Sequence, residues 1–292
     1  MAGAAALSRG PTGPFELSIG FLIMGGLLAS FLWKENVAVG SSSKGTSDGN
    51  AAASNEENTS SKPTIRDAVK VVRTNPKIML VGAIQSLFEA AMYIFVLNWP
   101  PAVEKVVSSY FSKFAANSSS NIGTPYGTVF SCFMACCLLG STLFGRLTSP
   151  TKVEKDGRSR AVSTENFAIG MLGVSAVAMG SATIAMGSAT VTPGAILSII
   201  IASFFLFESC VGMYFPAIGT LRSKHFPDSH RSVVMNLFGV PLNIMVVAVF
   251  LNIERLGVQG ALGVSTAALS AATACGLKLR GLVNRDKESE PK

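Results

Sequence analysis

Charged side chains are scarce in this sequence. Asp, Glu, Lys and Arg make up 14% of its 292 residues, whereas hydrophobic residues make up 49%. A soluble domain carries about 25% charged residues, so this chain lacks the polar surface that would coat a soluble body. The few charges crowd into short stretches and leave long apolar runs nearly free of them. That segregation is typical of a protein whose main solvent is lipid.

Motifs of other protein classes are missing as well. The net charge is +7, but no Lys/Arg-rich stretch carries the interleaved aromatics of a nucleic-acid surface, so we expect basic membrane loops and no nucleic-acid partner. The five cysteines all lie in apolar runs, form no CxxC pair and have no histidine nearby. We therefore expect no metal site, disulfide framework or cofactor. No paired aspartates, Ser/His dyad or HExxH sequence suggests an enzyme.

Apolar runs long enough to cross a membrane recur along the chain. A spanning helix needs about 20 mainly apolar residues. The first run is short and follows Pro11 and Pro14, but it lacks the basic start and small-residue cleavage site of a signal peptide, so we predict a spanning helix. Six further runs follow it. The predicted spans are residues 17–33, 78–97, 126–144, 165–187, 194–215, 232–251 and 260–279.

The regions outside the main runs differ in composition. Residues 37–61 are rich in Ser, Gly, Asn, Ala and Glu, which predicts a disordered linker. Residues 63–77 are basic and carry apolar residues at helical spacing, which predicts a short helix at the membrane surface. The chain then divides into an N-terminal segment with one span (1–36), a linker (37–77), a six-helix unit (78–279) and a tail (280–292).

Lys and Arg content alternates between rich and poor from one connection to the next. The linker is rich, the loop at residues 105–113 is poor, and the alternation continues to a rich C-terminal tail. By the positive-inside rule the linker and the tail are cytoplasmic, and the first span starts outside. Because no convincing signal sequence precedes that span, the chain looks like a piece whose earlier spans are missing.

Two of the apolar runs share a sequence pattern. The segments Phe88–Tyr93 and Phe207–Tyr214 both begin with Phe-Glu, continue through small residues to Met-Tyr, and are followed by a proline. Each opens a group of three spans, and the expected topology makes the two copies cross in opposite directions. One half of a major facilitator transporter should show such a three-plus-three inverted repeat. A non-transporting membrane protein, such as a receptor-like or scaffold fragment, is the alternative interpretation, and it gives no reason for the repeat.

Each copy carries a carboxylate in mid-span. An ionised carboxylate in the bilayer centre is costly, so Glu89 and Glu208 should face a cavity, find a partner or stay protonated. Gln85 lies one turn before Glu89 and should share its face. We predict a substrate or proton pathway at these residues, with hydrogen bonding between helices as the alternative.

Four other polar residues complete the candidate pathway. Asn236 and Asn243 are seven residues apart and share one face of the sixth of the seven runs, residues 232–251. A cavity role and helix–helix hydrogen bonding are both open for this pair. Tyr93 and Tyr214 fit either interfacial anchors or cavity walls.

Glycine also recurs in one of the runs. Gly173, Gly180 and Gly187 repeat every seven residues. Small residues on one face let two helix backbones approach closely. The spacing therefore predicts a helix-packing stripe and no functional site.

Several of these segments resemble a known family. Residues 85–89 with Tyr93 and Trp99-Pro100 look like the seventh helix of the molybdate-anion transporter family. Residues 207–224 resemble its tenth helix and following loop, and residues 235–243 its eleventh. The borders of the first run are similar to those of its sixth helix. The resemblance implies an all-α membrane protein with the C-terminal six-helix bundle of the major facilitator superfamily, preceded by one further helix.

The resemblance also implies a function, that of the complete relative. It is uptake of molybdate, a tetrahedral dianion, by alternating access in the plasma membrane, with membrane lipid and an N-terminal half absent from this chain as partners. A dianion needs Arg, Lys or N–H donors, and the apolar cores of the predicted spans carry no Arg or Lys. We therefore expect amide and hydroxyl donors from the candidate residues and cationic partners from the other half. The glutamates would carry protons or pair with those cations.

Overall fold

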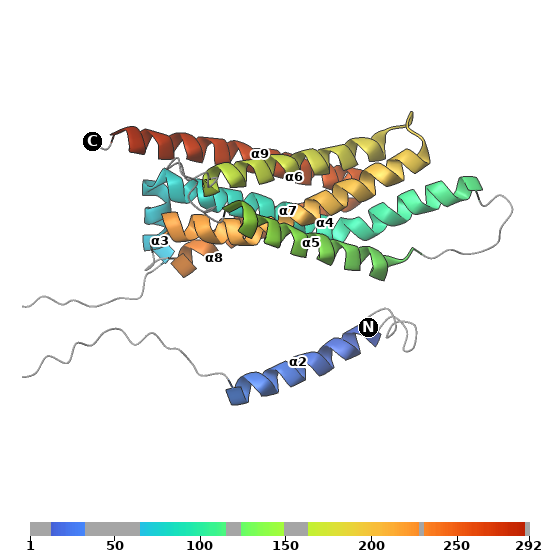
Figure 1. The fold of residues 1–292 in the computed structure, drawn as a ribbon, viewed down its shortest axis with the longest axis horizontal. Helices are drawn as coiled ribbons and strands as arrows, with labels where there is room; N and C mark the ends of the chain where they lie inside the picture. The colour runs from blue at the N-terminus through green and yellow to red at the C-terminus, as the bar shows by residue number, and fades with distance from the viewer. Residues whose placement is uncertain (1–12, 33–64, 115–123, 149–162, 228–230, 290–292) are drawn as a thin grey trace, which may run out of the picture. The chain divides into compact units, whose positions relative to one another are not determined.

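The computed structural model describes residues 13–32, 65–114, 124–148, 163–227 and 231–289, and every element in these residues is a helix (Figure 1). The chain divides into two units, residues 1–60 and 61–292. The helices are α2 (Gly13–Leu32), α3 (Ile65–Thr74), α4 (Pro76–Phe114), α5 (Tyr126–Thr148), α6 (Thr164–Gly187), α7 (Pro193–His225), α8 (Arg231–Leu251) and α9 (Ile253–Ser289).

The first unit contains one described helix, α2. It is apolar around its whole circumference, and its large side chains, such as Leu22 and Phe31, are exposed. Such a helix needs lipid or other helices around it. The helix agrees with the first predicted span, although its apolar stretch, Glu16–Leu32, is shorter than the others. The predicted disordered linker at residues 37–61 lies outside the described residues.

In the described part of the second unit, six helices, α4 to α9, are long and apolar enough to cross a membrane. Together with α2 they confirm the predicted all-α membrane class. Apolar segments of this length form helices because a helix satisfies its backbone polar groups internally. An isolated strand or loop in lipid cannot do so. The protein is therefore an integral multi-pass membrane protein.

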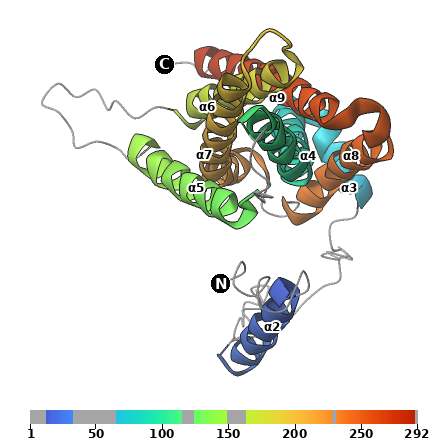
Figure 2. The same ribbon diagram turned by 90° about the vertical axis from the view of Figure 1, so that its right-hand side faces the viewer.

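Helices α4 and α7 form the centre of this unit. α4 packs against α7, α8 and α9, and α7 packs against α4, α5 and α6. Seen along the bundle (Figure 2), α6 and α9 lie together on one side of the α4–α7 pair, and α5 and α8 lie apart from each other on the other side. Exchanging α4–α6 with α7–α9 leaves this pattern of neighbours unchanged.

The two central helices also run in opposite directions (Figure 1). α4 begins at the end of the bundle where α7 finishes. This is the orientation expected of the two copies of the repeat, since an inverted repeat brings equivalent helices together head to tail.

Three helices continue well beyond the C-terminal ends of the predicted spans. α4 continues through Pro100 to Phe114, α7 continues to His225, and α9 continues to Ser289. The prediction of a loop at residues 105–113 is therefore wrong, and the predicted tail is helical as far as Ser289. Apolarity marks the part of a helix that lies in lipid, but the backbone hydrogen bonds continue beyond it. Hydropathy alone thus ends these three helices too early.

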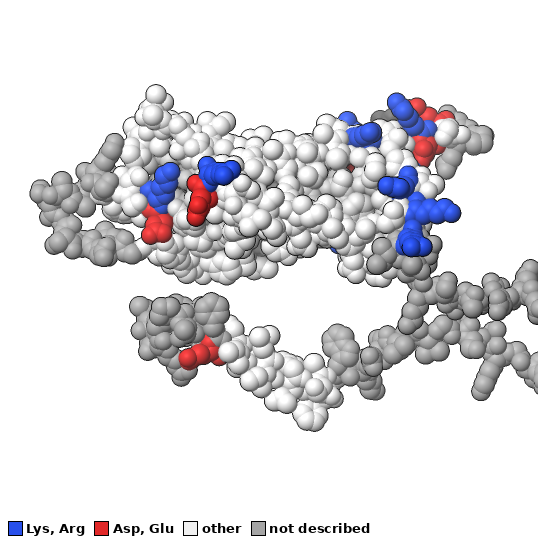
Figure 3. Space-filling model, turned by 180° about the vertical axis from the view of Figure 1, so that it is seen from behind, with Lys and Arg blue, Asp and Glu red and all other residues white. Residues whose placement is uncertain are grey.

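On the face of the bundle that Figure 3 shows, charged side chains gather at the two ends and leave a band of uncharged surface between them. Most described Lys and Arg residues lie at the end that holds α3 and the C-terminal end of α9. The opposite end carries the neighbouring pairs Glu104-Lys105 and Glu254-Arg255. This separation agrees with the alternation seen in the sequence. That the basic end faces the cytoplasm stays a prediction.

The short helix predicted in residues 63–77 is present as α3. Its Ala68 and Val72 side chains are buried, and the helix packs against α4 and α8. Its apolar face is therefore covered at least in part by the bundle itself. Asn75 and Pro76 then start α4, and the Asn75 side chain accepts a hydrogen bond from the Lys77 backbone N–H at 3.0 Å. An Asn cap followed by Pro is a strong helix start.

The predicted glycine stripe is confirmed as a packing surface. Gly173, Gly180 and Gly187 of α6 all face α9. Their nearest side chains there, Thr273, Thr266 and Gln259, show the same seven-residue spacing. The two stripes match because helices that cross at a shallow angle meet every two turns.

Helices α5 and α7 approach even more closely, at a place that the sequence did not reveal. A Cβ on Gly140 would lie 1.9 Å from the Ser209 carbonyl oxygen. A Cβ on Gly212 would lie 1.9 Å from the Cys137 carbonyl oxygen. Each helix thus presents a glycine to the backbone of the other, so this crossing tolerates no side chain at either position.

Candidate functional site

The two copies of the repeat meet through their phenylalanines. Phe88 of α4 and Phe207 of α7 are fully buried, and their ring centroids are 6.1 Å apart. Tyr214 stacks on Phe88 with a centroid distance of 4.1 Å and an interplanar angle of 15°. Because consecutive helix residues point about 100° apart, the glutamate after each inward phenylalanine must leave the contact sideways.

Glu89 is the centre of a polar network between α4 and α7. Its Oε1 accepts hydrogen bonds from the Tyr214 hydroxyl at 2.9 Å and from Arg222 Nη2 at 3.1 Å. Arg222 Nε also donates to Gln85 Oε1 at 3.1 Å. The network therefore joins two residues one turn apart on the first repeat helix to two residues on the second.

The ion pair of this network is largely withdrawn from solvent. The Arg222 and Glu89 side chains are 16% and 19% exposed, and Tyr214 is 1% exposed. Removing one partner of such a pair leaves a poorly solvated charge, which costs more than the pair itself contributes. Each of the two charges thus depends on the other in this arrangement.

Arg222 corrects a prediction from the sequence. We expected it in a loop and expected no cation in the spans, but α7 continues to His225 and its guanidinium reaches Glu89. The spacing contains a signal for this contact. Tyr214 and Arg222 are eight residues apart, about two turns, so they share a face, and Gln85 and Glu89 share one on α4.

Glu208 lies elsewhere. It is buried, and no hydrogen bond or ion pair with any described residue holds its carboxylate. Gly212, one turn further along α7, contacts the Cys137 backbone, so this face of α7 points toward α5. Glu89 of α4 thus contacts one face of α7, whereas Glu208 of α7 lies on the face toward α5. Of the two glutamates, only Glu89 belongs to the network.

The remaining candidates are also outside the network. Tyr93 is 47% exposed, and Asn236 and Asn243 of α8 are exposed. Tyr93 follows its glutamate by four residues, whereas Tyr214 follows Glu208 by six. Two extra residues turn a helix by about 200°, so the two tyrosines occupy opposite faces although their motifs look alike.

A second polar cluster lies at the basic end of the bundle. Glu165 at the start of α6 forms an ion pair with Lys224, and its Oε1 is 3.9 Å from His225 Nε2. Lys77 and Asp286 form a further pair between α4 and α9. Sequence reasoning missed these contacts, because the helix ends that meet here are far apart in the chain.

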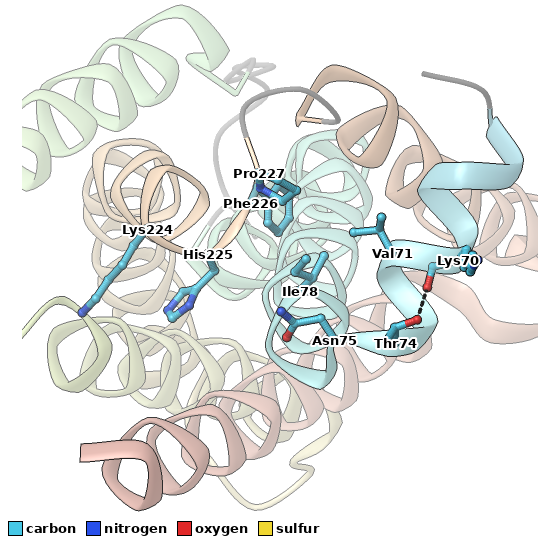
Figure 4. A pocket seen from close by; sticks show the side chains of 9 residues that line it. All are labelled: Lys70, Val71, Thr74, Asn75, Ile78, Lys224, His225, Phe226 and Pro227. Carbon is cyan, nitrogen blue, oxygen red and sulfur yellow. Dashed lines mark hydrogen bonds between the residues drawn. The ribbon is translucent and has the colours of Figure 1, made fainter. Parts of the chain in front are cut away.

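A cavity of about 570 Å³ adjoins this cluster (Figure 4). The Val71, Ile78 and Phe226 side chains approach one another there, whereas the Lys224 side chain extends away from them (Figure 4). The wall of the cavity is thus mainly apolar, and the Lys224 side chain is directed to Glu165. The nine lining residues are Lys70, Val71, Thr74, Asn75, Ile78, Lys224, His225, Phe226 and Pro227.

Comparison with known proteins gives consistent matches. A family described as sugar transporters with 12 transmembrane helices matches residues 3–199. The molybdate-anion transporter of Takifugu rubripes is 27% identical over 253 residues, which cover 82% of this chain and 45% of that protein. The Xenopus laevis protein of the same name is 25% identical over 286 residues, covering 97% and 53%. The Danio rerio one is 29% identical over 181 residues, covering 61% and 31%.

These coverages limit what the matches say. The chain spans about half the length of the curated relatives it matches. No solved structure matches it. What the relatives' names say about molybdate is therefore a statement about those proteins.

The packing of six spanning helices in two exchangeable groups of three, together with the sequence matches, defines a membrane protein of the major facilitator type. Within that class the chain belongs to the molybdate-anion transporter family.

Proposed function

We propose that this chain is the C-terminal part of a secondary transporter that takes up an inorganic oxyanion of the molybdate class across the plasma membrane. The observation that carries the proposal is the Arg222 guanidinium, held between the two repeat helices and largely withdrawn from solvent. The names of the relatives supply the class of substrate.

A guanidinium at this position has the chemistry that an oxyanion requires. Molybdate is a tetrahedral dianion, and the planar Arg fork offers paired N–H donors to such oxygens. The bonds to Gln85 and Glu89 use Nε and Nη2. The N–H groups of Nη1 and one N–H of Nη2 remain as donors to a ligand.

The proposal includes a partner half. Facilitators of this type bind substrate between two halves that rock against each other around the site, and this chain spans about half of its relatives. We therefore place the substrate between the α4–α7 face that holds Arg222 and an N-terminal bundle of the same architecture.

Uptake measurements on a joined protein test the proposal. The N-terminal half of the Xenopus laevis relative is fused to this chain and expressed in cells, with the complete relative as positive control. Molybdenum uptake is measured by mass spectrometry, and surface biotinylation verifies the amount in the plasma membrane. We expect uptake by the fusion, loss of uptake in Arg222→Gln, and no loss in Lys105→Gln, a matched change at the opposite end of the bundle.

Two outcomes would count against the proposal. The first is a fusion that reaches the surface in the same amount as the relative but transports no molybdate. The second is an Arg222→Gln variant that transports as well as the unsubstituted fusion. A non-transporting membrane protein would give the first outcome.

A further inference from the structure

We infer that Glu89 is the binding site of a proton that travels with the anion, so that the transporter is a proton–oxyanion symporter. The inference rests on the proposed function and names its coupling ion. It starts from the ion pair between Glu89 and Arg222, because the carboxylate of Glu89 already binds the guanidinium that an anion would need.

The geometry makes Glu89 and the anion competitors. Glu89 Oε1 receives Arg222 Nη2 at 3.1 Å and the Tyr214 hydroxyl at 2.9 Å. With both groups ionised, the pair has no net charge, and an approaching anion meets the carboxylate as well as the guanidinium. Like charges in a poorly solvated place repel strongly. The pair as the structure shows it thus disfavours an anion.

One proton changes this balance. Protonation converts the Glu89 carboxylate to a carboxylic acid, removes the ion pair and raises the net charge of the two residues from zero to +1. The guanidinium keeps its neutral partner Gln85, which orients it without neutralising it. An oxyanion can then take the place of the carboxylate. A dianion leaves a net charge of −1 at these two residues, which the partner half has to balance.

Release runs in the opposite order. When the anion leaves, the guanidinium has no counter-charge, and the Glu89 carboxylate 3.1 Å away is the nearest group that can supply one. Re-forming the ion pair requires a carboxylate rather than a carboxylic acid, so the proton leaves at this step. The proton therefore binds before the anion on one side of the membrane. On the other side it leaves after the anion.

Among the residues that the structure describes, no other charge near Glu89 could replace Arg222. Arg222 and Tyr214, both of α7, are the titratable groups in contact with Glu89 among the described residues. α8 carries its charge in the first turn, and α9 carries its charges in its first turn and last turns. α3 has its basic residues at the end of the bundle. Glu208 forms no ion pair with a described residue, so protonation of Glu208 would free no cation for an anion.

Transport by the joined protein in proteoliposomes tests the inference. The membrane potential is clamped to zero, and molybdate accumulation is measured with and without an inward proton gradient. With one proton per anion, we expect up to about tenfold accumulation for each unit of pH difference. Counterflow, the exchange of labelled for unlabelled molybdate without a gradient, is measured in the same vesicles.

The variants separate coupling from binding. We expect Glu89→Gln to retain counterflow but to lose gradient-driven accumulation and the pH dependence of uptake, because glutamine leaves Arg222 without a carboxylate. Glu104→Gln, a matched change near the end of the same helix, should keep the full response. Arg222→Gln should lose counterflow at every pH.

Each result has one meaning. Absence of counterflow in the unsubstituted protein would overturn the proposed function. Counterflow without any accumulation on a proton gradient, or a Glu89→Gln variant that accumulates like the unsubstituted protein, would overturn the inference and leave the proposed function standing. A variant that fails to insert is recognised by its yield in the vesicles, and Glu89→Asp, which keeps the charge and the proton, then replaces it and should accumulate molybdate.

Discussion

The crossing of α5 and α7 gives the sharpest prediction for stability. In Gly212→Ala the new Cβ would lie 1.9 Å from the carbonyl oxygen of Cys137 and 2.7 Å from its carbonyl carbon. In Gly140→Ala it would lie 1.9 Å from the Ser209 carbonyl oxygen. Both obstacles are backbone atoms in a helix, so no side chain can rotate away and the two helices must move apart.

The size of the effect follows from two opposing contributions. Overpacking a fitted contact costs about 1–3 kcal/mol, and alanine recovers up to about 1 kcal/mol of helix propensity relative to glycine. We therefore expect a net loss of about 1–2 kcal/mol for each single change. The double variant should lose less than the sum, because one separation of the helices accommodates both methyl groups.

Thermal unfolding of the purified full chain in detergent measures this effect. For a chain of this size, 1 kcal/mol corresponds to about 2–4 °C in Tm. Gly127→Ala on α5 and Gly219→Ala on α7 are the controls, since nothing lies within 4 Å of their added Cβ. They should unfold at the same temperature as the parent or slightly above it. A Gly212→Ala variant as stable as these controls would refute the close crossing.

Three further predictions follow from the same structure. Gly187→Ala should cost less than about 1 kcal/mol in the same assay, because the Cβ meets the mobile end of Gln259, at 2.1 Å, rather than backbone; a loss as large as at the α5–α7 crossing would contradict this. Tyr214→Phe keeps the ring stack but removes one hydrogen bond to a carboxylate, so it should cost about 1.5–3 kcal/mol, and an unchanged Tm would show that the bond contributes nothing. A cysteine at Ser118 should react with an impermeant reagent added to intact cells, whereas a cysteine at Gly49 should not; the reverse pattern would invert the topology.

Part of the site was accessible from the sequence. Glu89 was singled out because a carboxylate in an apolar run is costly and needs a partner. Gln85 was chosen because it shares the face of Glu89, and Tyr214 as an interfacial anchor or cavity wall, and the structure brings these three together. The same arguments selected Glu208, as a carboxylate, and Tyr93, as an anchor or cavity wall, and the structure places both elsewhere. A motif read by eye ignores the two-residue difference in spacing, and helix geometry converts that difference into opposite faces.

The missing cation shows the limit of a hydropathy argument most clearly. Arg222 was assigned to a loop because the apolar run ends before it. A long arginine side chain at the end of a helix can extend back along it and place its charge well inside the apolar boundary. Only a contact between residues 133 positions apart reveals that this happens here.

The sequence by itself determined that this is a multi-pass helical membrane protein, which segments form its spans, that basic residues collect at one end, and that the glycines of α6 pack against a neighbour. These properties are sums or periodicities over one segment, so they need no knowledge of the other helices. The tertiary structure alone decided which carboxylate meets a cation, which tyrosine is buried, and where two helices touch backbone to backbone. Those outcomes depend on how far each helix is rotated against its neighbour, and that rotation is set by packing across the whole bundle.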